Sequence, residues 1–155
     1  MLYDVINYLS SLPLIFLYLA LILLSAIPFV EAHITVPLGI MLGLSFPVCC
    51  LIGLSANFLS VLLTVKVMNK TNKDTYSSIR MDKAKVLGRR YGVPCLALMG
   101  PILGANHISA AAAVLLGASI RAIYFWQLIS ICLWGIGTGL LFLHGITFFK
   151  EGSFF

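Results

Sequence analysis

Two uninterrupted apolar stretches, residues 46–68 and 122–149, constrain the fold of this chain more than any other feature. A helix that spans the hydrocarbon core of a bilayer needs about 20 consecutive apolar residues, and both stretches exceed that length. Two further apolar stretches are residues 12–30 and 93–119. Of the 155 residues, 61% are hydrophobic and 10% are charged, whereas soluble domains carry about 25% charged residues. We therefore expect an all-α, multi-pass integral protein of the cell membrane and exclude an ordinary soluble enzyme.

The net charge of the chain is confined to one connector between apolar stretches. Residues 69–92 hold seven basic and two acidic residues, which accounts for the whole net charge of +5. Segments rich in Lys and Arg stay on the cytoplasmic side of a membrane, so we expect this connector to be cytoplasmic. It would also attract anionic lipid headgroups, by about 1 kcal/mol per basic residue close to the surface. Membrane lipids are therefore the expected partners, and nucleic acid is not.

The first apolar region is broken by residues that a continuous spanning helix does not tolerate. Pro28, Glu31, His33, Pro37 and Gly39 interrupt a sequence that is otherwise apolar to position 45. Two such prolines break a helix, and a carboxylate within a membrane costs several kcal/mol unless it faces protein or water. We expect a re-entrant hairpin with its tip near residues 31–37. The alternative is an extracellular loop, which the apolar second arm, residues 34–45, disfavours.

The third apolar region is interrupted in the same way. Pro101 and Gly104 break it in the middle, and Asn106 and His107 follow the break. Each half of the chain thus has an apolar arm, a break with polar residues, a second arm and a long apolar helix. Corresponding breaks in two halves are typical of inverted-repeat transporters. We expect a single membrane domain, residues 1–155, built from a hairpin-plus-helix unit 12–68, the connector 69–92 and a second such unit 93–149.

Arg121 bears on the topology of the second unit. If residues 93–119 form a hairpin that enters and leaves on the cytoplasmic side, Arg121 also lies on that side, as the positive-inside bias favours. The first hairpin then enters from the opposite face. The alternative is an arginine that merely extends to the interface from a helix end.

A few polar side chains within the apolar segments are the candidates for function. Glu31 is the one acidic residue in these segments, and His33 follows two residues later. A carboxylate beside an imidazole is typical of a proton relay or coupling site, although both could instead cap the hairpin tip. Asn57 is expected to hydrogen-bond between helices or to contact a tip. Asn106 and His107 are expected to line a cavity facing Glu31, where helix N-termini favour an anion.

The sequence holds no motif for catalysis or for a metal. Ser/His/Asp sets, HExxH and paired carboxylates do not occur, and no CxxC is present among the four cysteines. We therefore predict neither an enzyme nor a cofactor or metal site.

Several segments of the sequence resemble those of a known protein family. The segment 28–44 resembles the glutamate-bearing segment of the small multidrug export proteins, which carry P-x-x-E-x-R-G-x-x-P-x-G. The sequence Ser-Ala-Asn ending at Asn57 is similar to the G-N of their next helix, and segments 91–94 and 100–104 are similar to their second break. His33 stands where the family has arginine. The resemblance covers roughly residues 25–117 and implies membership of the DedA/VTT membrane superfamily, with two opposed re-entrant hairpins and an association with lipid-carrier translocation and lipid scrambling.

These features predict a membrane transporter or translocase for an anionic lipid-linked or amphipathic substrate, such as a phosphate-bearing lipid carrier. Glu31 and His33 would couple transport to protons. Asn57, Asn106 and His107 would supply contacts, and Arg121 with the basic connector would attract headgroups. We expect a homodimer, because 155 residues enclose a transport path poorly. The alternative is a non-transporting membrane scaffold or assembly subunit, whose polar residues only pack helices.

Overall fold

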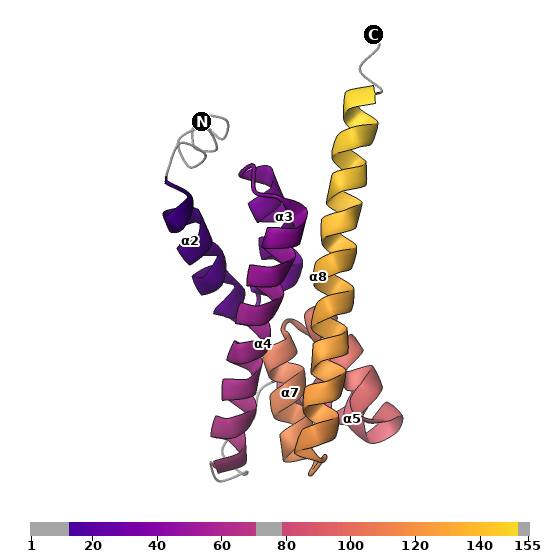
Figure 1. The fold of residues 1–155 in the computed structure, drawn as a ribbon. Helices are drawn as coiled ribbons and strands as arrows, with labels where there is room; N and C mark the ends of the chain where they lie inside the picture. The colour runs from indigo at the N-terminus through magenta and orange to yellow at the C-terminus, as the bar shows by residue number, and fades with distance from the viewer. Residues whose placement is uncertain (1–12, 71–78, 152–155) are drawn as a thin grey trace.

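The computed structural model describes residues 13–70 and 79–151, and the fold of these residues is helical, with turns and no strand. Figure 1 shows an elongated bundle in which α4 and α8 run along most of its length. The prediction of an all-α fold is confirmed for this part of the chain. The helices are α2 (Leu14–Ala26), α3 (Glu31–Met41), α4 (Phe46–Lys70), α5 (Ile79–Leu98), α6 (Gly100–Leu103), α7 (Asn106–Leu115) and α8 (Ile120–Glu151).

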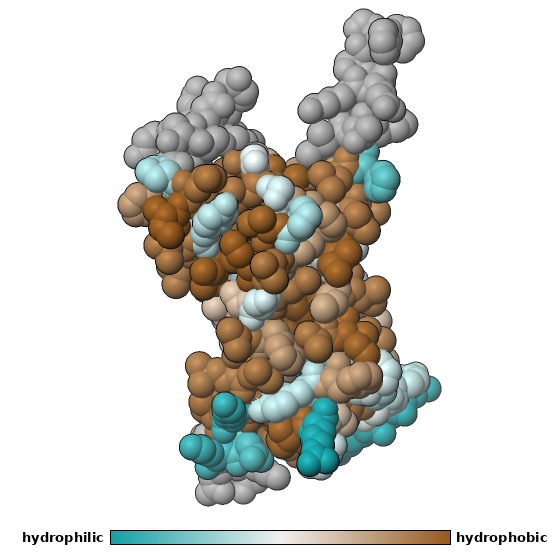
Figure 2. Space-filling view, in the orientation of Figure 1, coloured by the Kyte–Doolittle hydropathy of each residue, from teal (hydrophilic) through white to brown (hydrophobic). Residues whose placement is uncertain are grey.

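Two of these helices are long and apolar enough to cross a membrane, namely α4 and the Ile120–Gly145 part of α8. They match the two uninterrupted apolar stretches of the sequence. Many of their apolar side chains face outward: Leu51, Leu59, Leu63 and Leu141 are between 63% and 74% exposed. Figure 2 shows this apolar surface extending over the middle of the molecule, with hydrophilic residues gathered toward its lower end.

The first hairpin consists of α2, a turn at residues 27–30 and α3. Figure 1 shows that α3 returns toward the end of the molecule from which α2 starts. Pro28 lies in the turn, as expected. Its ring fixes φ and removes a backbone donor, which suits a chain reversal better than a continuing helix.

The tip of the first hairpin lies earlier in the chain than residues 31–37, where we expected it, and two residues that we assigned to the break lie elsewhere. Pro37 is inside α3, where it removes one helical hydrogen bond without ending the helix. Gly39 is also inside α3, and a Cβ there would lie 2.6 Å from Cys49 Sγ and 3.1 Å from Leu21 Cδ1. Gly39 therefore allows α3 to pack closely on α2 and α4 and does not form the break.

The second hairpin consists of residues 93–98 of α5, the short helix α6 and α7. Helix α5 bends at Gly92, whose φ of +78° lies in the left-handed region that favours glycine. Pro101 lies in the first turn of α6, and Gly104, with φ of +117°, ends this helix before α7 begins. The break at Pro101 and Gly104 thus separates the two arms of this hairpin.

The connector 69–92 is described in part. Lys70 ends α4, and residues 79–91 form the first arm of α5, which we call the basic arm. Residues 71–78, with Lys73 and Asp74, lie outside the described residues, as do residues 1–12 and 152–155.

Figure 1 shows the two hairpins approaching from opposite ends of the bundle, so that their turns meet near its middle. Each hairpin packs its own apolar core on α4. One core holds Leu17, Leu21 and Val36, and the other holds Val61, Val65 and the alanine-rich face of α7. The residues at which the hairpins meet are largely polar, and they form the candidate site.

Candidate functional site

Glu31 connects the two hairpins. It is the first residue of α3 and its side chain is fully buried. The backbone N–H of Asn106 donates a hydrogen bond to Glu31 Oε1 at 2.8 Å, and His107 Nδ1 lies 2.7 Å from the same oxygen. Asn106 and His107 are themselves buried at the start of α7. The structure thus brings together three of the six candidate site residues, from segments about half the chain apart.

The carboxylate of Glu31 occupies the N-terminus of α7. The first backbone N–H groups of a helix lack partners within the helix and carry the positive end of its dipole. Glu31 Oε1 accepts one of these groups, from Asn106. We expected an external anion at such a helix start, and here the anionic side chain belongs to the other hairpin.

His107 uses both of its ring nitrogens in hydrogen bonds. Nδ1 lies 2.7 Å from Glu31 Oε1, and Nε2 lies 2.6 Å from Ser60 Oγ, which is also 2.8 Å from the backbone oxygen of Ala26. A hydroxyl has one hydrogen, so Ser60 donates either to Ala26, with Nε2–H donating to Ser60, or to an unprotonated Nε2. A proton lies between Nδ1 and Oε1 in both arrangements.

His33 lies near Glu31 but is not its hydrogen-bond partner. His33 Nδ1 is 3.8 Å from Glu31 Oε2, beyond hydrogen-bond distance, and neither atom has another partner. Residues two apart on a helix point to different faces, which explains why His33 does not close on the carboxylate. Its side chain is 19% exposed, whereas that of Glu31 is 0% exposed. Glu31 therefore has one oxygen engaged with the second hairpin and the other facing a partly exposed imidazole.

The backbone at the first turn is in an unusual conformation. Phe29 and Glu31 have φ values of +77° and +49°, the only positive values among the described non-glycine residues. Such conformations cost of order 1–3 kcal/mol each and persist when the surroundings determine them. The buried contacts of Glu31 with α7 are such surroundings.

A second set of polar contacts joins α8 to the second hairpin. Ser130 Oγ lies 2.8 Å from the backbone oxygen of Ala97 and 3.2 Å from Asn106 Oδ1. Gln127 Nε2 donates to Ser109 Oγ at 2.8 Å, and Ser109 donates to the backbone oxygen of Asn106 at 2.9 Å. These bonds hold the start of α7, and with it His107, in place.

Neither Asn57 nor Arg121 forms a hydrogen bond with Glu31: Asn57 is buried on α4, and Arg121 is exposed at the end of the bundle. Asn57 is buried on α4, one turn before Ser60, and neither its amide oxygen nor its amide nitrogen has a hydrogen-bond partner. It lies one turn after Gly53, where a Cβ would lie 3.2 Å from Val36 and 3.4 Å from the hydroxyl oxygens of Ser25 and Thr35 in the first hairpin. Arg121 is exposed in the first turn of α8, at the end of the bundle, and the structure does not bring it to Glu31.

Sequence reasoning did not identify Ser60, Ser109, Gln127 or Ser130 as site residues. Helical spacing was an available signal for Ser60, which lies three residues after Asn57 and shares its face. Gln127 is the one glutamine of the chain and lies within an apolar stretch. Among the described residues, no group of three or more His, Cys, Asp or Glu could hold a metal ion.

No family model, no curated protein and no solved structure matches this chain. The resemblance to the small multidrug export proteins therefore stays a prediction, and the function must be argued from the geometry.

Proposed function

We propose that the chain is a proton-coupled membrane transporter or translocase, with two re-entrant hairpins that enter the bilayer from opposite faces. The single observation that carries this proposal is the buried Glu31–His107 pair, which joins the turns of the two hairpins. Broken helices whose ends meet near the middle of the membrane form the binding and coupling sites of many secondary transporters.

The outer surface supports the placement in a bilayer. Apolar side chains on α2, α4 and α8 are widely exposed, among them Leu23, Leu51 and Leu141 at 66% to 74%. Leaving apolar area in water costs roughly 25 cal/mol per Å², whereas lipid tails cover it without cost. The hydrophilic residues at the lower end in Figure 2 would then lie at the membrane–water interface.

The chemistry of the Glu31–His107 pair favours a function over packing alone. Replacing a buried ion pair by apolar residues of similar volume is often neutral or stabilising. A protein selected only for a stable bundle therefore gains little from a carboxylate at this depth. Intramembrane carboxylates more often mark proton or substrate pathways.

A change in protonation would alter the contacts between the hairpins. When His107 Nε2 loses its proton, Nδ1–H still donates to the Glu31 carboxylate, and Ser60 must donate to Nε2. Ser60 then releases the backbone oxygen of Ala26 at the end of α2. Protonation of Glu31 and His107 together removes the carboxylate charge from the N-terminus of α7. Each event changes bonds among the first hairpin, α4 and the second hairpin, which is what coupling requires.

The substrate we propose is an anionic lipid-linked or amphipathic molecule. Exposed cations at the end of the bundle where α4 ends and α8 begins support this choice: Lys66, Lys70, Lys83, Arg89, Arg90 and Arg121. A second copy of the chain would complete the path. The groove between α4 and α8 offers it an apolar face, lined by Pro47, Cys50, Leu51, Leu54, Ser55, Phe58, Leu128 and Cys132.

A non-transporting membrane scaffold is the second candidate. It is favoured by the fact that Glu31 Oε1, the Asn106 N–H and both ring nitrogens of His107 are engaged within the chain. A purely structural connection between hairpins would satisfy these groups in the same way.

Reconstitution into liposomes separates the two candidates. We expect the purified protein to move fluorescently labelled phosphatidylglycerol across the bilayer, measured by bleaching the outer leaflet with dithionite. The rate should rise when a pH gradient is imposed and fall when an ionophore collapses it, because the pair exchanges protons in each cycle. Movement no faster than in protein-free liposomes under both conditions would contradict the transporter and favour the scaffold.

A further inference from the structure

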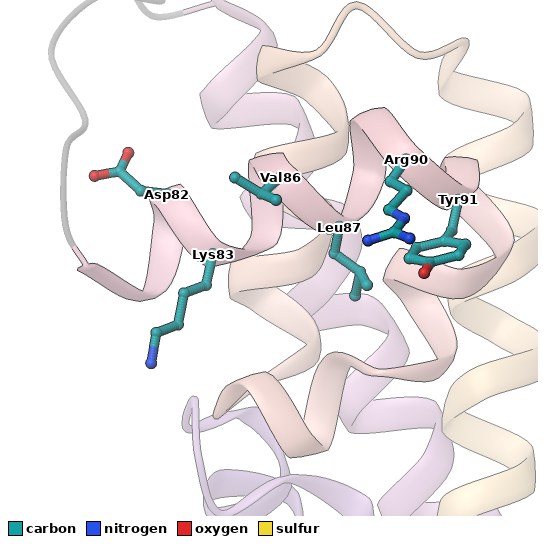
Figure 3. Close-up of a pocket in the computed structure, with 6 residues that line it drawn as sticks. All are labelled: Asp82, Lys83, Val86, Leu87, Arg90 and Tyr91. Carbon is teal, nitrogen blue, oxygen red and sulfur yellow. The ribbon is translucent and has the colours of Figure 1, made fainter.

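The basic arm of α5 borders a groove at the outer edge of the second hairpin. The groove has a volume of about 540 Å³, and its lining is drawn in Figure 3: Asp82, Lys83, Val86, Leu87, Arg90 and Tyr91. Gly88 allows this arm to pack closely on the hairpin, because a Cβ there would collide with Leu116, directly after α7, and lie 3.1 Å from Leu96. Other side chains of the arm line the groove.

The lining combines apolar walls with two cations. Lys83, Leu87 and Arg90 follow the helical spacing i, i+4 and i+7, so they share one face of the arm. The guanidinium of Arg90 lies 5.1 Å from the centre of the Tyr91 ring, and Figure 3 shows Leu87 between the two cations. The carboxylate of Asp82 points away from the ammonium group of Lys83 in this view. The face is therefore positive at both ends and apolar between them.

The groove lies where a bilayer surface is expected. It is at the end of the bundle that also carries the exposed Lys66, Lys70 and Arg121, which is the hydrophilic lower end in Figure 2. Tyr91, which is 54% exposed, is a residue type enriched at membrane interfaces. A ligand in this groove would have its polar group at the level of lipid headgroups.

We propose that the groove binds an anionic phospholipid. The lipid phosphate lies between Lys83 and Arg90, and the start of an acyl chain lies against Val86 and Leu87. Guanidinium groups bind phosphate oxygens with paired hydrogen bonds, and the lysine adds a second charge. Apolar walls directly beside the cations match an amphiphile better than a soluble anion, which would leave those walls in water. The proposal depends on the membrane placement argued above but not on transport.

Binding of defined lipids to the full-length protein in a non-ionic detergent tests this site. Phosphatidylglycerol and phosphatidylcholine with identical chains would be titrated and counted on the protein by native mass spectrometry. The variant Lys83→Gln/Arg90→Gln removes the two groove cations. Its matched control, Lys66→Gln/Lys70→Gln, removes two exposed cations of α4 at the same end of the bundle. All four side chains are exposed, so both variants are expected to fold.

We expect the wild-type protein to prefer phosphatidylglycerol, the groove variant to lose affinity for it by roughly tenfold or more, and the control to change by less than about threefold. Equal losses in both variants would show diffuse attraction to the basic end and overturn the site. Equal binding of the two lipids would show that the cations do not contribute. Displacement by inorganic phosphate at matched concentration would identify a soluble anion site instead. None of these outcomes depends on flux, so they are independent of the proposed transport.

Discussion

Glu31→Gln is expected to abolish flux driven by a pH gradient while leaving the fold intact. Both hydrogen bonds of the side chain use Oε1, which accepts from the Asn106 N–H and faces His107 Nδ1. Glutamine keeps an oxygen there and places its amide nitrogen where Oε2 has no partner. The amide cannot exchange a proton, so the coupling step is lost. Flux in liposomes should fall to the protein-free level, with a melting temperature within about 4 °C of wild type.

Glu31→Ala is the matched comparison for this variant. It removes the hydrogen-bond acceptor as well as the charge, so the Asn106 N–H and His107 Nδ1 lose their partner in the core. Breaking a buried charged pair costs about 3–5 kcal/mol, and we expect this variant to melt well below the glutamine variant. Full, gradient-dependent flux with Glu31→Gln would defeat proton coupling at this residue. The contacts of Glu31 would then be structural, and the scaffold would be the better interpretation.

Gly100→Val is expected to destabilise the protein through the turn of the second hairpin. A Cβ at Gly100 would collide with Asn106 Oδ1 and lie 3.0 Å from Ser109 Oγ and 3.1 Å from the Asn106 Cα. The Cα of Asn106 can move only if the start of α7 moves with it. That shift separates the Asn106 N–H from Glu31. Overpacking alone costs about 1–3 kcal/mol, and a weakened buried hydrogen bond adds about 1 kcal/mol or more. Denaturant unfolding in detergent should show this loss, and flux should fall with it.

Gly137→Ala is the control for this substitution. It lies within α8, and no atom is found within 4 Å of a Cβ built at Gly137. Alanine in a helix is favoured over glycine by about 0.5–1 kcal/mol, so this variant should be as stable as wild type or slightly more stable. Similar destabilisation by the two substitutions would mean that the contact between Gly100 and α7 does not hold the second hairpin in place.

Local sequence patterns located the two long helices and the break at Pro101 and Gly104. They placed the tip of the first hairpin too late in the chain, and they did not show that residues 79–91 of the connector are helical. Proline and glycine limit where a helix can continue, so the break at Gly104 could be read from residue type alone. The length and composition of α4 and α8 follow equally directly from two uninterrupted apolar stretches. The same logic singled out Glu31, Asn106 and His107, because a polar group in an apolar segment needs a partner.

The sequence placed Asn106 and His107 opposite Glu31, but it did not show which residue makes the direct contact with the carboxylate. His33 is its nearest candidate in the sequence, but two residues of separation turn it to another face of α3. His107 reaches the carboxylate only because the two hairpins meet, and this depends on how α4 and α8 hold them. Pro37 and Gly39 were misplaced for a related reason: the packing of α3 on α2 and α4 maintains a helix that residue type alone would end.

Single cysteines can test the proposal that the two hairpins enter the bilayer from opposite faces. Four exposed positions mark the ends of the segments: Pro13 before α2, Ser45 after α3, Lys70 at the end of α4 and Ser119 before α8. Each would be changed to cysteine, one at a time, in a protein whose native cysteines are replaced by alanine. These native residues are Cys49, Cys50, Cys95 and Cys132.

The direct measurement is labelling of these four variants with a membrane-impermeant thiol reagent, applied to intact cells and to inverted vesicles. Two re-entrant hairpins predict that the cysteines at Pro13 and Ser45 react from one face, and those at Lys70 and Ser119 from the other. Labelling of the Pro13 and Ser45 positions from opposite faces would mean that residues 13–45 cross the membrane. Labelling of the Ser45 and Ser119 positions from the same face would likewise contradict two opposed hairpins that meet at Glu31 and His107.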